Sequence, residues 1–164
     1  MTKILLLSDT HSHIDGAILK YAKQADEVWH AGDIGSFEVT DALKEFCTVR
    51  AVHGNIDNYE IQREFPEHNR FYCEAVDVWL THIGGYPGKY NVRVRHDIKK
   101  NPPKLFICGH SHILKVMNDN DLGVLHMNPG ACGKHGFHQV RTMLRFTIDS
   151  SAIGNLEVIE LGKR

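Results

Sequence analysis

Seven polar side chains in this sequence are of the types that bind transition metals, namely carboxylates, an amide oxygen and imidazoles. They are Asp9, His11, Asp33, Asn55, His82, His110 and His112. Because the set contains no thiolate, it suits Mn²⁺, Fe²⁺, Ni²⁺ or Zn²⁺ in an open catalytic site better than a closed structural zinc site. The chain also has 12 histidines in 164 residues, and histidine serves as metal ligand, acid and base near neutral pH. These residue types predict metal-dependent catalysis.

Two pairs of these residues have i, i+2 spacing, Asp9 with His11 and His110 with His112. In extended backbone this spacing places both side chains on the same side of the chain. Each pair can then reach a single metal cluster. A carboxylate shared between two cations offsets their repulsion, and Asp33, central in the order of these residues, is the candidate for that bridge.

The first half of the chain alternates short apolar runs with segments of helical spacing. Strands are predicted at residues 4–7, 28–31 and 48–52, and helices within 14–25 and 39–46. Ser36 is a plausible N-cap for the second helix. This alternation is the signature of parallel βαβ construction.

Beyond about Asn69 the pattern changes to strands joined by turns. Further strands are predicted at 71–73, 76–80, 105–108, 116–117, 124–125, 143–148 and 156–161, and a helix at 92–99. The stretch from Gly84 to Tyr90 is read as a connecting loop. The expected fold is α/β, with two packed mixed β-sheets flanked by helices.

Five of the seven polar residues stand at or just past the carboxyl end of a predicted strand; they are Asp9, Asp33, Asn55, His82 and His110. In open α/β sheets the ligand site lies outside these strand ends, so we expect the five side chains to converge although they are scattered in sequence. Three of them follow a glycine, which permits a tight turn and a close backbone approach.

Composition bounds the class of protein. A length of 164 residues and a hydrophobic content of 42% fit one domain spanning 1–164 with a real core. A formal net charge of -1 offers no net field for a polyanion, so nucleic-acid binding by bulk charge is not expected. The four cysteines form no Cys-x-x-Cys pair and are expected to be reduced core thiols. Without a secretory signal or a membrane-length apolar segment, the expected location is the cytoplasm.

Short motifs surround the seven residues: Ser8-Asp9-Thr10-His11, His30-Ala31-Gly32-Asp33, His53-Gly54-Asn55-Ile56-Asp57, Thr81-His82, Gly109-His110-Ser111-His112 and the further loop Asn128-Pro129-Gly130. In this order they resemble the calcineurin-like metallophosphoesterases, specifically their small bacterial and archaeal phosphodiesterase branch. The resemblance spans most of the chain. Any one motif alone is weak evidence, whereas the ordered set is specific.

The resemblance implies a binuclear metal centre, in which Asp9, His11 and His112 hold one ion, Asn55, His82 and His110 hold the other, and Asp33 bridges them. Asp33, Asn55 and His110 are then the expected catalytic residues, with Mn²⁺ expected first and Ni, Fe or Zn as alternatives. Two cations about 3.5–4 Å apart can bind phosphate oxygens, activate a shared water and stabilise the departing oxygen. The expected reaction is hydrolysis of a small phosphodiester by a metal-bridging hydroxide.

One position departs from the broader family, which has a histidine where this chain has Ile56. That histidine is thought to protonate the leaving group, and positioned acid catalysis typically contributes about 10²–10⁴-fold. Substrates whose leaving group departs unassisted, such as aryl phosphodiesters, are therefore expected. Asp57, His135 and His138 are alternative acids among which spacing does not choose.

The remaining histidines are interpreted as structural. His30 and His53 lie in strand-end sequences and are expected to be core or supporting residues. His68, His96 and His126 are expected at the surface.

Two other functions can be built on the same fold. Some members, such as a subunit of the eukaryotic retromer coat, serve in assembly, but those tend to have eroded ligand motifs. A DNA-repair-type nuclease needs a surface that tracks a phosphate backbone, and no dense Lys/Arg run supplies one. A small-molecule phosphodiesterase is therefore ranked first, with a non-catalytic scaffold or a nuclease as alternatives. The sequence is compatible with a homo-oligomer.

Overall fold

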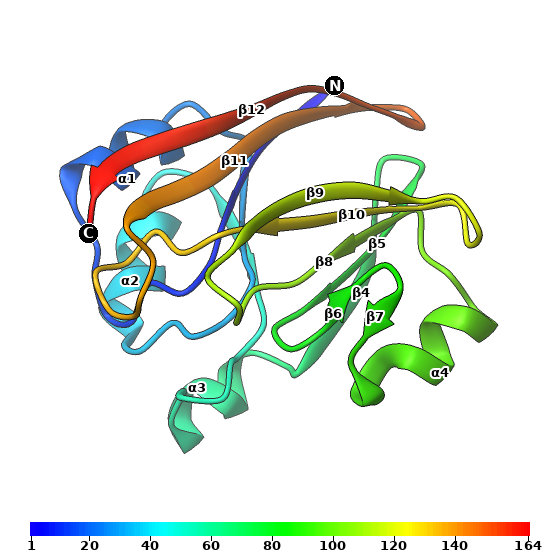
Figure 1. The fold of residues 1–164 in the computed structure, drawn as a ribbon. Helices are drawn as coiled ribbons and strands as arrows, with labels where there is room; N and C mark the ends of the chain where they lie inside the picture. Colours follow the sequence, from blue (N-terminus) through cyan, green and yellow to red (C-terminus); the bar gives the residue numbers. More distant parts are fainter.

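Four helices and twelve strands are present in the computed structural model, which describes residues 1–164 (Figure 1). The helices are α1 (Gly16–Ala22), α2 (Phe37–Lys44), α3 (Tyr59–Glu64) and α4 (Val92–Lys100). The strands are β1 (Thr2–Leu7), β2 (Glu27–His30), β3 (Thr48–Ala51), β4 (His68–Cys73), β5 (Val76–Thr81), β6 (Gly85–Tyr86), β7 (Lys89–Tyr90), β8 (Leu105–Ile107), β9 (Leu114–Asp119), β10 (Val124–Pro129), β11 (Val140–Asp149) and β12 (Ala152–Lys163).

Ten of the strands form two five-stranded sheets, and β6 and β7 form a separate hairpin. The first sheet has the order β12-β11-β1-β2-β3 and the second β4-β5-β8-β10-β9. Strands β1, β2 and β3 run parallel, as do β5, β8 and β10, while the outer strands β11, β12, β4 and β9 pair antiparallel. Both sheets are thus mixed, as the sequence predicts.

Alternating side chains build four layers, helix on sheet on sheet on helix. In β1, Ile4 and Leu6 point into the core between the sheets, whereas Leu5 and Leu7 join the core beneath α1 and α2. In the second sheet, Phe106 packs instead with Val94 of α4. Figure 1 shows α1 and α2 at one side of the sandwich and α4 at the other. The period of two in the apolar pattern thus fixes which face each strand buries.

Most predicted elements are present, and the exceptions are short. Helix α3 was not expected; it has six residues and buries only Ile61, which is too little for a helical period to be visible. The predicted loop from Gly84 to Tyr90 contains the β6–β7 hairpin. Ser36 does precede α2, but its hydroxyl makes no capping hydrogen bond.

All four cysteines are free, and only Cys47 is not fully buried. Each helix is too short to cross a membrane.

Candidate metal centre

The seven proposed ligands lie together where the loops after five strands meet. These loops follow β1, β2 and β3 of the first sheet and β5 and β8 of the second. The expected convergence therefore occurs, but across a sandwich of two sheets and not along one open edge. Ligand atoms within 4.8 Å of one another form two groups, Asp9 with His11 and His112, and Asp33 with His82 and His110. The amide oxygen of Asn55 lies 3.2 Å from His82 Nε2, beside the second group.

The sequence predicted that extended backbone would place both members of each i, i+2 pair on the same side of the chain. That reason was wrong, because the backbone at these residues is not extended. Positive φ angles occur at Asp9 (55°), His11 (46°), Asp33 (55°), His110 (69°) and His112 (58°). Left-handed backbone is uncommon for residues other than glycine. The pairs therefore converge because the chain turns sharply at each ligand, an arrangement that spacing alone does not reveal.

Asp9 is fully buried, and its two oxygens have different surroundings. Oδ2 accepts hydrogen bonds from the Ser8 hydroxyl at 2.6 Å and from the His110 amide at 3.2 Å. Oδ1 lies 3.1 Å from His112 Nε2 and 3.9 Å from His82 Nε2, yet accepts no hydrogen bond. One oxygen is thus anchored, and the other faces the histidines.

The Asp33 carboxylate lies between the two groups. Its Oδ2 is 3.5 Å from His11 Nε2, and its Oδ1 is 3.2 Å from His82 Nε2 and also accepts from the Ile56 amide at 3.2 Å. Burial alone would raise the pKa of Asp33, but the hydrogen bond and charge of His82 outweigh it and lower that pKa. Burial likewise disfavours the His82 imidazolium, but Asp33 and Asp9 raise the pKa of His82. The centre therefore favours positive charge between its carboxylates.

Hydrogen bonds orient two of the imidazoles. His82 Nδ1 donates to the Ala31 carbonyl at 2.7 Å, which leaves Nε2 facing Asp33. His138 Nε2 donates to the Gly133 carbonyl at 2.9 Å, so its neutral ring accepts from His112 Nδ1, 3.2 Å away. This fixes the His112 tautomer with a free lone pair on Nε2, as partners of metal-bound histidines commonly do. The sequence did not assign that role to His138.

These donors fit a divalent cation. Burial lowers the pKa of His11 and of His110, which favours the neutral ring with a free lone pair. Two buried atoms of the centre, Asp9 Oδ1 and His11 Nε2, lack any hydrogen-bond partner. Orphaned buried polar atoms are rare and costly, and here carboxylate, amide and imidazole donors converge on them, a set that suits divalent transition metals.

His30 and Asp57 hold the ligand loops from behind. His30 is fully buried, which lowers the pKa of its ring to about 4; it accepts from the Gly32 amide and donates to the Thr10 hydroxyl at 2.9 Å. Asp57 accepts three hydrogen bonds from backbone amides, of Ile34, Gly35 and Gly54. His30 is thus the supporting residue that was expected, and Asp57 joins the loops after β2 and β3.

The structure separates the three alternatives for a general acid. Asp57 has both oxygens bound to amides and is 3% exposed, and His138 is engaged with His112 and Gly133. His135 remains exposed, with its ring centroid 4.8 Å from that of His11. Ile56 is 46% exposed and offers no proton.

The expectation for the outlying histidines was correct at two positions and wrong at the third. His68 and His96 are exposed, and His53 is half-buried and bound to the Phe65 carbonyl. His126 is 1% exposed instead of lying at the surface. It belongs to β10, and the sequence around it gave no sign that this face of the strand would be covered.

Two cavities flank the centre. One, of about 290 Å³, is lined by Asn55 and His82 together with His53, Gln62 and Arg93. The other, of about 160 Å³, begins at His110 and extends beneath the β6–β7 hairpin. Both include Ile83.

A two-sheet α/β sandwich with two groups of metal ligands at its strand ends is the arrangement found in metallophosphoesterases. The chain belongs to the calcineurin-like phosphoesterase superfamily, whose domain model matches residues 2–151. A probable metallophosphoesterase from Methanothermobacter thermautotrophicus is 30% identical, with 77% of this chain and 74% of that protein covered. One from Mycoplasma pneumoniae is 31% identical, with 80% and 79% covered.

Solved structures share the fold. An archaeal phosphodiesterase is 22% identical with a TM-score of 0.70, covering 97% of this chain and 99% of its own. Vps29 from Entamoeba histolytica, solved with zinc, is 18% identical with a TM-score of 0.75, covering 97% and 98%. The fold and family together support a hydrolase that binds divalent metal and acts on phosphoesters.

Proposed function

We propose that this protein is a binuclear metal-dependent phosphodiesterase that hydrolyses small phosphodiesters. The observation that carries the proposal is the position of Asp33, whose two oxygens face histidines of both ligand groups, His11 and His82. A carboxylate in that place can bridge two cations. When bound, the cations would stabilise charge on phosphate oxygens and activate water.

The protein's own residues would position these charges. Asp9, His11 and His112 would hold one ion, and Asn55, His82 and His110 the other. Ser8 and the His110 amide fix the Asp9 carboxylate, and His138 and the Ala31 carbonyl fix the rings of His112 and His82. Mn²⁺ is our first expectation for the metal.

A diester is favoured over a monoester because cavities flank the ligand groups on two sides. A diester has two substituents to accommodate, whereas a monoester has one. The likeness in fold to an archaeal phosphodiesterase supports this choice. Because Ile56 has no proton to donate, aryl leaving groups should depart faster than alkyl ones.

Metal-stripped protein, re-supplied in turn with Mn²⁺, Ni²⁺, Fe²⁺ or Zn²⁺, would be assayed on a panel of phosphomonoesters and aryl and alkyl phosphodiesters. We expect metal-dependent turnover that is fastest on aryl diesters. Metal binding without hydrolysis of any ester would favour the scaffold function instead. Cleavage of DNA at rates that fall steeply with salt would favour a nuclease.

The Asp33→Ala variant should lose metal-dependent hydrolysis by about 10³-fold or more, since the cations supply several kcal/mol of transition-state stabilisation. Asp33→Asn tests the same charge while keeping a residue that tolerates left-handed backbone. Asp41→Ala, at an exposed position of α2, is the control. Retained turnover with bound metal in both Asp33 variants would refute the bridging role.

A further inference from the structure

The smaller cavity beside the centre has side chains that the proposed chemistry does not use. Its volume is about 160 Å³, and its walls come from the β6–β7 hairpin, the loop after β8, and strands β9 and β10. Its lining includes the side chains of Tyr86, Lys115 and His126. Since Gly109, His110 and Ser111 also line it, the cavity adjoins the metal centre at His110.

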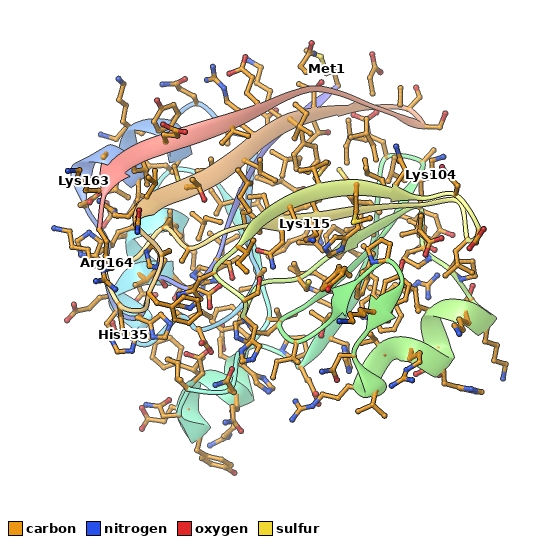
Figure 2. All side chains as sticks on the ribbon, in the orientation of Figure 1. Met1, Lys104, Lys115, His135, Lys163 and Arg164 are labelled. Atoms are coloured by element: carbon orange, nitrogen blue, oxygen red, sulfur yellow. The ribbon has the colours of Figure 1, made fainter.

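Lys115 is the cavity's only charged side chain, and it has no carboxylate partner. It forms no ion pair, and no aspartate or glutamate lines the cavity. Its ammonium nitrogen lies 4.1 Å from the centroid of the Tyr86 ring, a cation–π contact that holds it without neutralising its charge. Figure 2 labels Lys115 on β9, beside the hairpin.

The larger cavity differs in this respect. Its cation, Arg93, is paired with Glu67 at 3.4 Å, and both residues line that cavity. The positive charge there is compensated within the protein, whereas the charge of Lys115 is not. The two substituents of a bound diester would therefore meet different electrostatic surroundings.

His126 is a further polar side chain in the wall of this cavity. It lines the cavity, is 1% exposed, and its Nδ1 has no hydrogen-bond partner. Burial, assisted by the charge of Lys115, lowers the pKa of His126 to about 4, so the ring is neutral and adds no charge of its own. The positive charge in the cavity is therefore that of Lys115 alone.

We propose that this cavity is a subsite for a second oxyanion, a carboxylate or phosphate, carried on one ester substituent of the substrate. The inference rests on the proposed phosphodiesterase function and specifies its substrate class. Lys115 pairs with the oxyanion, Tyr86 holds the ammonium group in place, and the Ser111 hydroxyl offers a hydrogen bond along the wall. Lys115 is thus a specificity-determining residue that does not contact the reacting phosphorus.

The test uses three p-nitrophenyl phosphodiesters whose other substituent is ethyl, carboxyethyl or phosphoethyl. They share one leaving group, so differences in kcat/KM report on the second substituent. In the metal-loaded wild type we expect KM to be about tenfold lower for the two anionic substrates, which corresponds to one charge-assisted contact. Comparison of KM between the carboxyethyl and phosphoethyl substrates shows which oxyanion fits better.

Lys115→Gln should remove that preference while leaving kcat and KM for the ethyl diester unchanged. Lys104→Gln is the matched control, because Lys104 precedes β8 at the end opposite His110 and lies outside the cavity (Figure 2). A preference retained in Lys115→Gln, or no preference in the wild type, would overturn the subsite. Equal losses on all three substrates would also overturn it, since they indicate a general structural effect.

A binding measurement separates this inference from the proposed function. Calorimetry with non-hydrolysable phosphonate analogues of the ethyl and carboxyethyl diesters requires no turnover. Tighter binding of the carboxyethyl analogue, lost in Lys115→Gln, supports the subsite even if no diester is hydrolysed. Turnover of all three diesters with equal affinity for both analogues rejects the subsite and leaves the phosphodiesterase proposal intact.

Discussion

At the scale of single residues, most of the proposed ligands have an unusual backbone conformation in addition to a metal-binding side chain. Five of the seven have left-handed φ angles, a conformation that costs roughly 1–2 kcal/mol for residues other than glycine. Such strain persists only where the surrounding structure maintains it, and it clusters at functional sites. The site is therefore expected to lower stability in the absence of metal.

His110 offers a clean test of this strain, because its side chain is exposed and its φ is 69°. His110→Gly should be more stable than His110→Ala by about 1 kcal/mol, since glycine adopts positive φ without a steric penalty. Both variants remove the same imidazole, so metal binding should fall equally in each. Urea unfolding with a chelator present measures the difference; equal midpoints would argue against stored strain at this residue.

At the scale of elements, the ligand loops are held by side chains that bridge from one element to the next. Asp15 is an example: it caps α1 by accepting from the Ile18 amide, and it pairs with the buried Arg141 of β11 at 2.8 Å. Arg141 also donates to the Cys132 carbonyl at 2.7 Å. This network links α1, which follows the first ligand loop, to β11 of the first sheet.

The charge of Asp15 should make stability depend on pH. Burial opposes ionisation, but hydrogen bonds from Ile18, His13 and Arg141 outweigh it and lower the pKa of Asp15 to about 2. Because this pKa is below that of the unfolded chain, the stabilisation is complete above about pH 4 and is lost as pH falls towards 2, with a magnitude of about 2 kcal/mol.

Asp15→Asn isolates that charge, since asparagine also caps helices well. At pH 6 the variant should be less stable than the wild type by about 2 kcal/mol, and the gap should close near pH 2. Denaturant unfolding across this range is the measurement, with exposed Asp41→Asn of α2 as the control. A gap that stays constant with pH would mean that the loss is steric and not electrostatic.

At the scale of the whole molecule, the centre joins the two sheets, since its ligands follow strands of both. A cation bound there would bridge the halves of the sandwich in the folded state alone. Metal should therefore stabilise the protein globally, by about 2.7 kcal/mol at a concentration of 100 times Kd.

Thermal unfolding with and without Mn²⁺ checks this prediction. The midpoint should rise with metal in the wild type, return to its starting value with chelator, and rise less in Asp33→Asn, which lacks the carboxylate shared by the two groups. An increase of equal size in Asp33→Asn would show that the Asp33 carboxylate does not hold the metal.

The sequence by itself determined the order and type of most elements and the identity of the candidate donors. Apolar runs with a period of two, such as Ile4 to Leu7, and helical spacing in residues 39–46 are local signals, and the motifs around Asp9, Asp33 and His110 are local too. Short elements such as α3 carry too few apolar positions to give such a signal.

Only the tertiary structure decided how these donors meet and what surrounds them. The left-handed turns at the ligands, the pairing of His138 with His112, and the burial of His126 depend on contacts between residues distant in sequence. A histidine's role is set by burial and by the partner of its other ring nitrogen, and both arise only when two sheets pack together.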